Sequence, residues 1–170
     1  MLEPTTTLRA LVVYESMFGN TATIAASVAT GLRLEDLDVE LVHVSDVVDR
    51  DLSGVDLLMV GGPTHAFSLS RPATREDAVR QGAPADVAAP GLREWIEALP
   101  SSQPSGPHHA ATFDTRVTKV RHLPKAASGR AARLLRHHGF TLLGRPTGFL
   151  VHGVQGGLVD GECERAVTWA

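Results

Sequence analysis

Small polar residues and one glycine follow the first apolar run of the chain, and their spacing suits anion binding. Leu11–Tyr14 is a short apolar run, and the residues that follow it at 16–21 are Ser16, Met17, Phe18, Gly19, Asn20 and Thr21. A buried strand that turns through such residues into a helix presents backbone N–H groups and hydroxyls to an anion. No Lys or Arg occurs between Leu11 and Leu32, so backbone dipoles and hydroxyls are expected to hold a phosphate here.

This loop and the paired histidines also suggest other kinds of site. The loop lacks the Gly-Lys-Ser/Thr of nucleoside-triphosphate loops and the G-x-G-x-x-G of dinucleotide sites. Ser16 and Thr21 also suit simple helix capping, which leaves capping and phosphate binding as alternatives. His108-His109 and His137-His138 are adjacent pairs without the spacing of a helical zinc site, and H-E-x-x-H is absent, so no metal site is predicted.

The elements that must position this loop alternate between strand and helix. Apolar runs predict strands at Leu11–Tyr14, Val39–Val44, Val55–Val60, Ala110–Phe113 and Gly148–His152. Helical spacing predicts helices around Ile24–Leu32, Leu92–Leu99, Lys125–His138 and Asp160–Trp169. Because parallel strands need crossover helices on both faces, we expect a doubly wound α/β fold with five parallel strands.

Two stretches do not fit the alternation. Ala66–Ala89 contains Pro72, Gly82 and several charges, and Pro100–His109 is rich in Pro, Ser and Gly. Both are predicted to be long loops. A loop of that length in a compact domain usually has a function, so Ala66–Ala89 is a candidate lid or docking surface.

Length and composition bound the class of protein. The chain has 170 residues, which at roughly 100 to 200 residues per domain indicates a single domain, 1–170. Its net charge of −3 and its 43% hydrophobic content are ordinary, so no nucleic-acid partner is expected. Cys163 is the only cysteine, and neither a signal peptide nor a membrane-spanning run is recognisable. We therefore expect a cytoplasmic protein without a membrane partner.

Three motifs resemble those of the flavodoxin-like family. Ser16, Gly19, Asn20 and Thr21 match the family's first loop, and Gly61–His65 reads like its second loop, Gly-x-Pro-Thr. Thr112–Arg116 follows the fourth predicted strand, where the third loop falls. The resemblance implies a sheet of order 2-1-3-4-5 with helices on both faces and the ligand at the switch point between strands one and three. Flavodoxin is a standard example of that rule.

By this resemblance the cofactor is FMN. The phosphate would be carried by Ser16, Met17, Phe18, Gly19, Asn20 and Thr21. The isoalloxazine ring would be lined by Pro63, Thr64, His65, Ala66, Phe67, Phe113, Asp114, Thr115 and Arg116. Neither ring loop contains Trp or Tyr, so His65, Phe67 or Phe113 would have to stack on the ring.

The function that the resemblance implies is electron transfer, because FMN performs the redox chemistry and the protein binds and orients it. No catalytic side chain is predicted, and a carrier with a separate redox partner protein is favoured over a stand-alone enzyme. The alternative is an FMN-dependent oxidoreductase such as an NAD(P)H:quinone reductase, since the Ser-Met-Phe-Gly-Asn-Thr loop also resembles loops of that branch. A third possibility is a regulatory module that has lost flavin.

Overall fold

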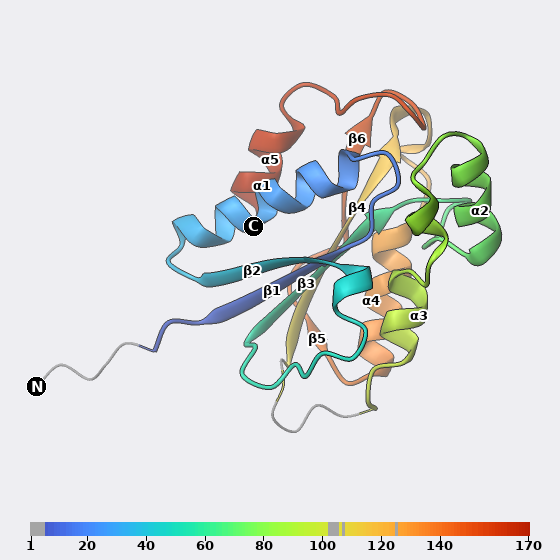
Figure 1. Cartoon of the computed structure of the whole chain (residues 1–170). Helices are drawn as coiled ribbons and strands as arrows, with labels where there is room; N and C mark the ends of the chain where they lie inside the picture. The colour runs from blue at the N-terminus through green and yellow to red at the C-terminus, as the bar shows by residue number, and fades with distance from the viewer. Residues whose placement is uncertain (1–5, 102–105, 107, 125) are drawn as a thin grey trace, which may run out of the picture.

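A parallel sheet forms the centre of the molecule, and helices cover both of its faces (Figure 1). The computed structural model describes residues 6–101, 106, 108–124 and 126–170. Its strands are β1 (Arg9–Tyr14), β2 (Asp38–His43), β3 (Leu57–Pro63), β4 (His109–Val117), β5 (Thr141–Leu142) and β6 (Thr147–Val151). The strand order β2-β1-β3-β4-β5 with parallel pairing throughout confirms the predicted fold class.

Two short strands share the last position of the sheet. β5 pairs with His109 and Ala110 at the start of β4, whereas β6 pairs with Phe113–Val117 further along the same strand. Gly144, whose φ of 66° lies in the left-handed region, falls in the segment between them. The predicted strand order is therefore correct, while the predicted count of five strands becomes six.

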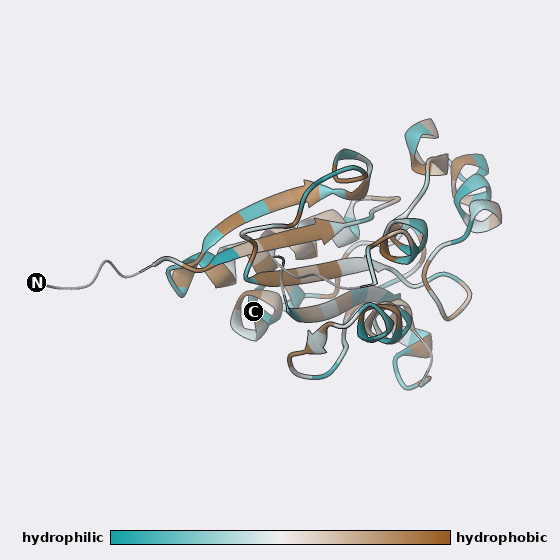
Figure 2. Cartoon of the chain, turned by 90° about the horizontal axis from the view of Figure 1, so that it is seen from below, coloured by the Kyte–Doolittle hydropathy of each residue, from teal (hydrophilic) through white to brown (hydrophobic). Residues whose placement is uncertain are grey.

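Each face of the sheet is covered by its own pair of helices. α1 (Asn20–Leu34) and α5 (Glu162–Trp169) cover one face, and α3 (Leu92–Glu97) and α4 (Ala127–His137) cover the other. Residues alternate between the faces as strand geometry requires, so that Val12 packs toward α1 and Val13 toward α3 and α4. Figure 2 shows the result: brown gathers on the strands, and teal on the outer helices and loops.

A close approach in the sheet depends on a glycine. A Cβ atom on Gly61 would lie 2.0 Å from the ring of Phe113 on the neighbouring strand. Phe113 in turn meets Phe149 and Trp169 edge to face, with ring centroids 6.3 and 6.1 Å away. This cluster joins β4, β6 and α5 within the core.

The segment Ala66–Ala89 is not the long loop that the sequence predicted. It contains α2 (Pro72–Arg80) and a short 3₁₀ helix, η2 (Ala85–Ala88). Pro72 occupies the first turn of α2, where its missing N–H costs nothing. Two further 3₁₀ turns are η1 (Val44–Asp46) and η3 (Thr118–Val120). Of the second predicted loop, Pro100–His109, residues 102–105 and 107 lie outside the described part of the chain, and His109 begins β4.

Candidate functional site

A cavity of about 260 Å³ opens where β1, β3, β4 and β6 end. Twelve of the predicted residues line it: Ser16, Met17, Phe18, Asn20, Thr21, Pro63, Thr64, His65, Ala66, Phe67, Thr115 and Arg116. Residues from all three motif segments therefore meet at one place, the carboxyl-terminal edge of the sheet, where ligands of open α/β folds bind.

The N-terminus of α1 faces this cavity without a side-chain cap. Its N-cap residue is Gly19, in the left-handed region with φ of 94°, and it supplies no capping side chain. The Ser16 hydroxyl instead accepts from the Gly19 N–H at 3.2 Å, and the Thr21 hydroxyl bonds the Thr115 hydroxyl at 2.7 Å. Because the first N–H groups of a helix have no intrahelical acceptor, those of α1 are left for a ligand. Ser16 and Thr21 are therefore not the caps of this helix.

The loop after β6 closes the same end of the cavity. The Asn20 side-chain amide donates to the Gly156 carbonyl at 2.6 Å, which ties the start of α1 to this loop. Val151 and Val154 form the adjoining apolar wall. Asn20 thus contributes to the site by holding a neighbouring loop in place.

The second loop contains a strained turn. Ala66 and Phe67 have φ of 46° and 62°, a conformation that residues other than glycine seldom adopt. His65 and Ser68 flank them and exchange two backbone hydrogen bonds of 2.9 and 3.0 Å, which is the pattern of a tight hairpin turn. The turn holds the ring of Phe67 at the cavity, 47% exposed.

Arg93 reinforces that turn from α3. Its guanidinium donates to the Ser68 hydroxyl and to the carbonyls of Leu69 and Ser70, at 3.0, 2.8 and 3.1 Å. Three hydrogen bonds from one planar group fix the backbone directly after the turn. They help to hold Ala66 and Phe67 in their strained conformation.

Thr64 and Asp114 join the cavity to α4. The Thr64 N–H donates to the Thr115 carbonyl at 2.9 Å, and its hydroxyl accepts from the Ala127 N–H at 3.0 Å. The fully buried Asp114 carboxylate accepts from the Ser128 N–H at 3.1 Å and from the Ser128 hydroxyl. The first two N–H groups of α4 are therefore satisfied by Thr64, which follows β3, and by Asp114, which lies within β4.

Three predicted site residues do not line the cavity. Gly19 contributes backbone conformation only, as described above. The prediction that Phe113 and Asp114 lie in a ring loop is wrong, because β4 continues to Val117 and both residues are inside the strand. The ring of Phe113 is 1% exposed in the core, and Asp114 pairs with Arg116 and caps α4.

Four further residues that line the cavity were not predicted from the sequence. All are valines: Val117, Val120, Val151 and Val154. The alternation of Phe113, Thr115 and Val117 on the α1 side of β4 was the available signal for a longer strand. These valines give the cavity an apolar wall, where a planar ring could be sheltered from water.

The charges that line the cavity are few. The Arg116 guanidinium makes two hydrogen bonds, of 2.7 and 2.6 Å, to the Asp114 carboxylate, which offsets its charge. Burial lowers the pKa of His65, although Glu15 and Asp77 oppose the effect. His65 is therefore held toward its neutral form, and a phosphate at this site would be bound mainly by N–H groups and hydroxyls.

Sequence comparison points to flavodoxins over the N-terminal part of the chain. Residues 12–79 match the model of the family described as Flavodoxin. A flavodoxin of Aquifex aeolicus (strain VF5) is 41% identical over 58 residues, which is 34% of this chain and 31% of that protein. The aligned segment thus spans about a third of that relative's length.

Structural comparison extends the likeness to the whole chain. Flavodoxin 2 from Bacillus cereus superposes with a TM-score of 0.66 at 18% identity, covering 95% of this chain and 94% of that one. A flavodoxin from the domain Archaea gives 0.63 at 18% identity, covering 94% and 92%. A WrbA-like protein from Agrobacterium tumefaciens gives 0.51 at 13% identity, covering 96% and 92%. At these identities the likeness shows the fold alone.

Among the described residues, no group of three or more His, Cys, Asp or Glu is arranged to hold a metal ion. Nor does any described helix have the length and apolar character needed to cross a bilayer. FMN is the cofactor that flavodoxins bind, in agreement with the cofactor predicted from the sequence. The uncapped start of α1 suits its phosphate, and the apolar wall suits its ring. The family model over residues 12–79, the Aquifex relative and the superposed structures thus make the chain similar to flavodoxins in its N-terminal sequence and in its fold.

Proposed function

We propose that this protein binds FMN in the cavity at the carboxyl ends of β1, β3 and β4 and transfers electrons through it. The observation that carries the proposal is the start of α1, where Gly19 leaves the helix N–H groups without a side-chain cap beside Ser16 and Thr21. An uncapped helix N-terminus facing a cavity favours an anion. The flavodoxin match supports the identity of that anion as the phosphate of FMN.

In this proposal the chain supplies binding and orientation. Residues 16–21 carry the phosphate, with Gly19 acting through its backbone, while 63–67, Thr115 and Arg116 line the ring. Bound FMN supplies the redox chemistry, so no acid or base from the chain is needed. His65 and Phe67 are the aromatic side chains of the second loop at the cavity, and Phe67 is the one with an exposed face.

The proposal includes a setting for this activity. We infer a single domain over 1–170 that acts in the cytoplasm and exchanges electrons with a separate redox partner protein. The one continuous sheet, buried from both faces, supports the single domain.

The first prediction tests the cofactor. FMN should bind orders of magnitude more tightly than riboflavin, because several hydrogen bonds to a charged phosphate, each about 1.5 to 3 kcal/mol, are lost with riboflavin. Titration of the apoprotein with each flavin, followed by flavin fluorescence, measures the two affinities. Equal affinities would reject the residue 16–21 loop as a phosphate site.

A second function has one observation in its favour. The WrbA-like neighbour shares the fold, and this chain's Ser-Met-Phe-Gly-Asn-Thr loop resembles loops of the quinone-reductase branch. An FMN-dependent oxidoreductase is therefore the alternative to a carrier. Direct reduction by a nicotinamide cofactor separates the two functions.

A further inference from the structure

A second hollow adjoins the proposed flavin cavity and is lined by arginines. It has a volume of about 480 Å³ and shares Ala66 and Phe67 with the flavin cavity. Arg71, Arg93, Arg130 and Arg133 line it, and no acidic residue does. We call these four residues and this hollow the arginine groove.

The arginines of the groove converge from separate elements. Arg71 precedes α2, Arg93 lies on α3, and Arg130 and Arg133 lie one turn apart on α4. In the part of the chain that the structure describes, Arg71, Arg93 and Arg133 form no ion pair. Arg130 has Glu97 at 3.9 Å, which is a weak pair between two partly exposed side chains.

Arg93 shows that the groove is crowded with positive charge. Burial lowers the pKa of Arg93, and the like charges of Arg71 and Arg130 lower it further, against smaller opposing effects of Glu97 and Glu94. Its guanidinium is also fixed by its bonds to residues 68–70. A rigid group among like charges is arranged to meet an anion without reorganising.

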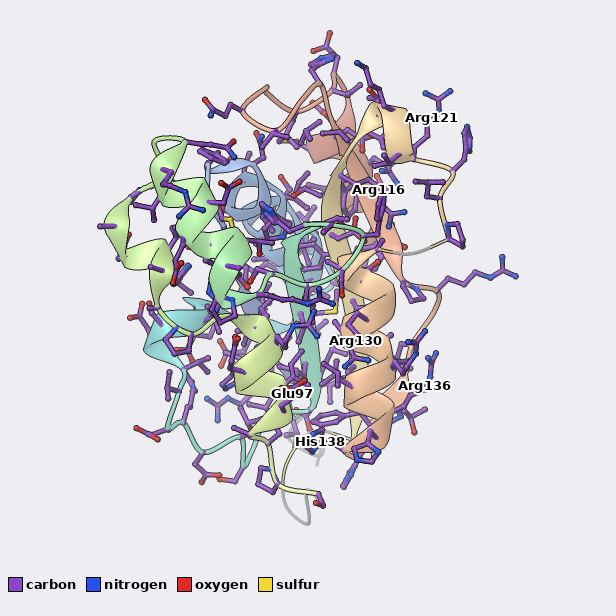
Figure 3. All side chains as sticks on the ribbon, turned by 90° about the vertical axis from the view of Figure 1, so that its right-hand side faces the viewer. Glu97, Arg116, Arg121, Arg130, Arg136 and His138 are labelled. Carbon is purple, nitrogen blue, oxygen red and sulfur yellow. The ribbon has the colours of Figure 1, made fainter. Side chains whose placement is uncertain are left out.

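The positive charge continues beyond the groove. Figure 3 shows Arg121, Arg130 and Arg136 along one side of the molecule, after η3 and on α4; Arg116 lies on the same side, but its charge is offset by the buried Asp114. The chain as a whole carries a net charge of −3, so a group of arginines on one side contrasts with the sign of its overall charge. An anion confined to the groove would leave the outer arginines of this side unused, whereas an acidic protein surface could cover them.

We propose that this side is the docking surface for an acidic redox partner protein, with the arginine groove at its centre. The inference rests on the proposed electron-transfer function, because docking here would place the partner against the Phe67 wall of the flavin cavity. Arginines beside an exposed aromatic ring are typical of the residues that dominate protein interfaces. Charge-steered docking also suits the weak, transient encounters of redox proteins.

The first arm of the test does not need flavin. Fluorescein-labelled hexaglutamate is titrated with the protein at low salt and followed by anisotropy. We expect Arg130→Gln with Arg133→Gln to weaken binding about tenfold, and salt to weaken it in the wild type. The matched control is Arg33→Gln with Arg50→Gln, which removes the same charge near β2 at the opposite edge of the sheet.

Each outcome of the peptide titration either supports or overturns the proposal. Loss confined to the groove variant supports the proposal. No binding, or equal loss in both variants, overturns it. Unlabelled pyrophosphate and unlabelled hexaglutamate are then compared as competitors of the labelled peptide. If pyrophosphate displaces it at a far lower concentration, the groove is assigned to a small phosphorylated ligand and the proposal is overturned. Unfolding temperatures of all variants check that the fold is kept.

The second arm links the groove to the flavin. Photoreduced, FMN-loaded protein is mixed anaerobically with ferricyanide, an anionic acceptor, or with hexaammineruthenium(III), a cationic one. Salt and the groove variant should slow oxidation by ferricyanide and speed oxidation by the ruthenium complex, while the control variant changes neither by more than about twofold. If the groove variant and the wild type are oxidised at the same rate by both acceptors, the proposal is contradicted. A protein that takes up no FMN in the flavin titration rejects the electron-transfer function, and the peptide arm still decides whether this side binds acidic chains.

Discussion

A single glycine at the start of α1 decides what the neighbouring hydroxyls do. With Gly19 as the N-cap residue, neither Ser16 nor Thr21 caps the helix, and both hydroxyls lie at the cavity with the free N–H groups. Most helices begin with a side chain that satisfies one of these N–H groups. Here the oxygens of a bound phosphate would accept hydrogen bonds from these N–H groups, so the ligand and the start of the helix should stabilise each other.

Removing either hydroxyl should weaken FMN without unfolding the protein. We predict that Ser16→Ala and Thr21→Ala each lower FMN affinity about tenfold or more, as expected for hydrogen bonds to a charged group. Ser27→Ala is the matched control, because the Ser27 hydroxyl bonds the Thr23 carbonyl on the exposed side of the same helix. Flavin titration measures affinity and thermal unfolding measures stability. A lower unfolding temperature with unchanged affinity would return these residues to a structural role.

The imidazole of His65 should titrate below its usual range. Burial lowers its pKa from the model-peptide value of 6.5, so the folded protein favours the neutral form. Its contribution to stability is therefore present above pH 6.5 and is lost as the pH falls below that value toward the folded pKa. NMR titration of the His65 ring should give a midpoint below 6.5. The stability advantage of the wild type over His65→Gln should shrink on going from pH 8 to pH 5, and a midpoint at or above 6.5 would contradict this.

The residues of the site were largely predictable, and the exceptions share one cause. Motif matching located the hydroxyl and Pro-Thr loops because they depend on local turn chemistry. It misplaced Phe113 and Asp114 because strand length depends on pairing with β3 and β6, which lie far apart in sequence. The same pairing brings Val117 to the cavity.

At the scale of elements, a buried polar network holds α2 and α3 against the end of β1. The Glu15 carboxylate accepts from the Ser70 hydroxyl and from the Leu92 N–H, and Arg75 bonds both Ser70 and Glu94 at 2.9 and 3.0 Å. Glu15 and Arg75 are 4% and 2% exposed. The network explains why α2 escaped prediction, since its inward positions include an arginine where a helical pattern would have an apolar residue.

Breaking that network should lower the free energy of unfolding. We predict that Arg75→Met destabilises the fold by about 3 kcal/mol, because it removes the cation that pairs with Glu94 and the buried donor to Ser70, the residue that bonds Glu15. For a chain of this size that corresponds to a fall in unfolding temperature of roughly 6 to 12 °C. Arg80→Met, on the same helix but in an exposed pair with Asp77, should cost less than about 1 kcal/mol. Denaturant unfolding measures both, and equal effects would show that the network does not stabilise α2.

Hydrophobic patterning predicted most strands and helices of the whole molecule but missed α2 and β5, and the order of the strands in the sheet came from the family resemblance. The contacts that link distant segments were not predicted. The first two N–H groups of α4, of Ala127 and Ser128, donate to Thr64 and Asp114, more than ten residues upstream, and no local sequence pattern predicts such a contact. The arginine groove likewise forms only when α2, α3 and α4 are brought together.

The reaction of the whole protein should be that of a carrier. The sequence has no dinucleotide fingerprint, and the groove adjoining the flavin cavity is arranged for an acidic surface. We predict that NADH and NADPH reduce the FMN-loaded protein slowly under anaerobic conditions. Stopped-flow absorbance followed by addition of a quinone tests this. Rapid bleaching of the flavin by either nucleotide, at a rate matching quinone turnover, would establish the oxidoreductase instead.

The divided last position of the sheet has a consequence for how the protein behaves among its own copies. An uninterrupted outer strand offers unpaired N–H and C=O groups on which another chain can extend the sheet, the first step of aggregation. Here that edge consists of a two-residue and a five-residue piece separated by a turn, while the opposite edge strand carries Asp38 and Glu40. Neither border offers a long apolar template. Newly made copies should therefore stay dispersed even when crowded, which suits the proposed role of a carrier.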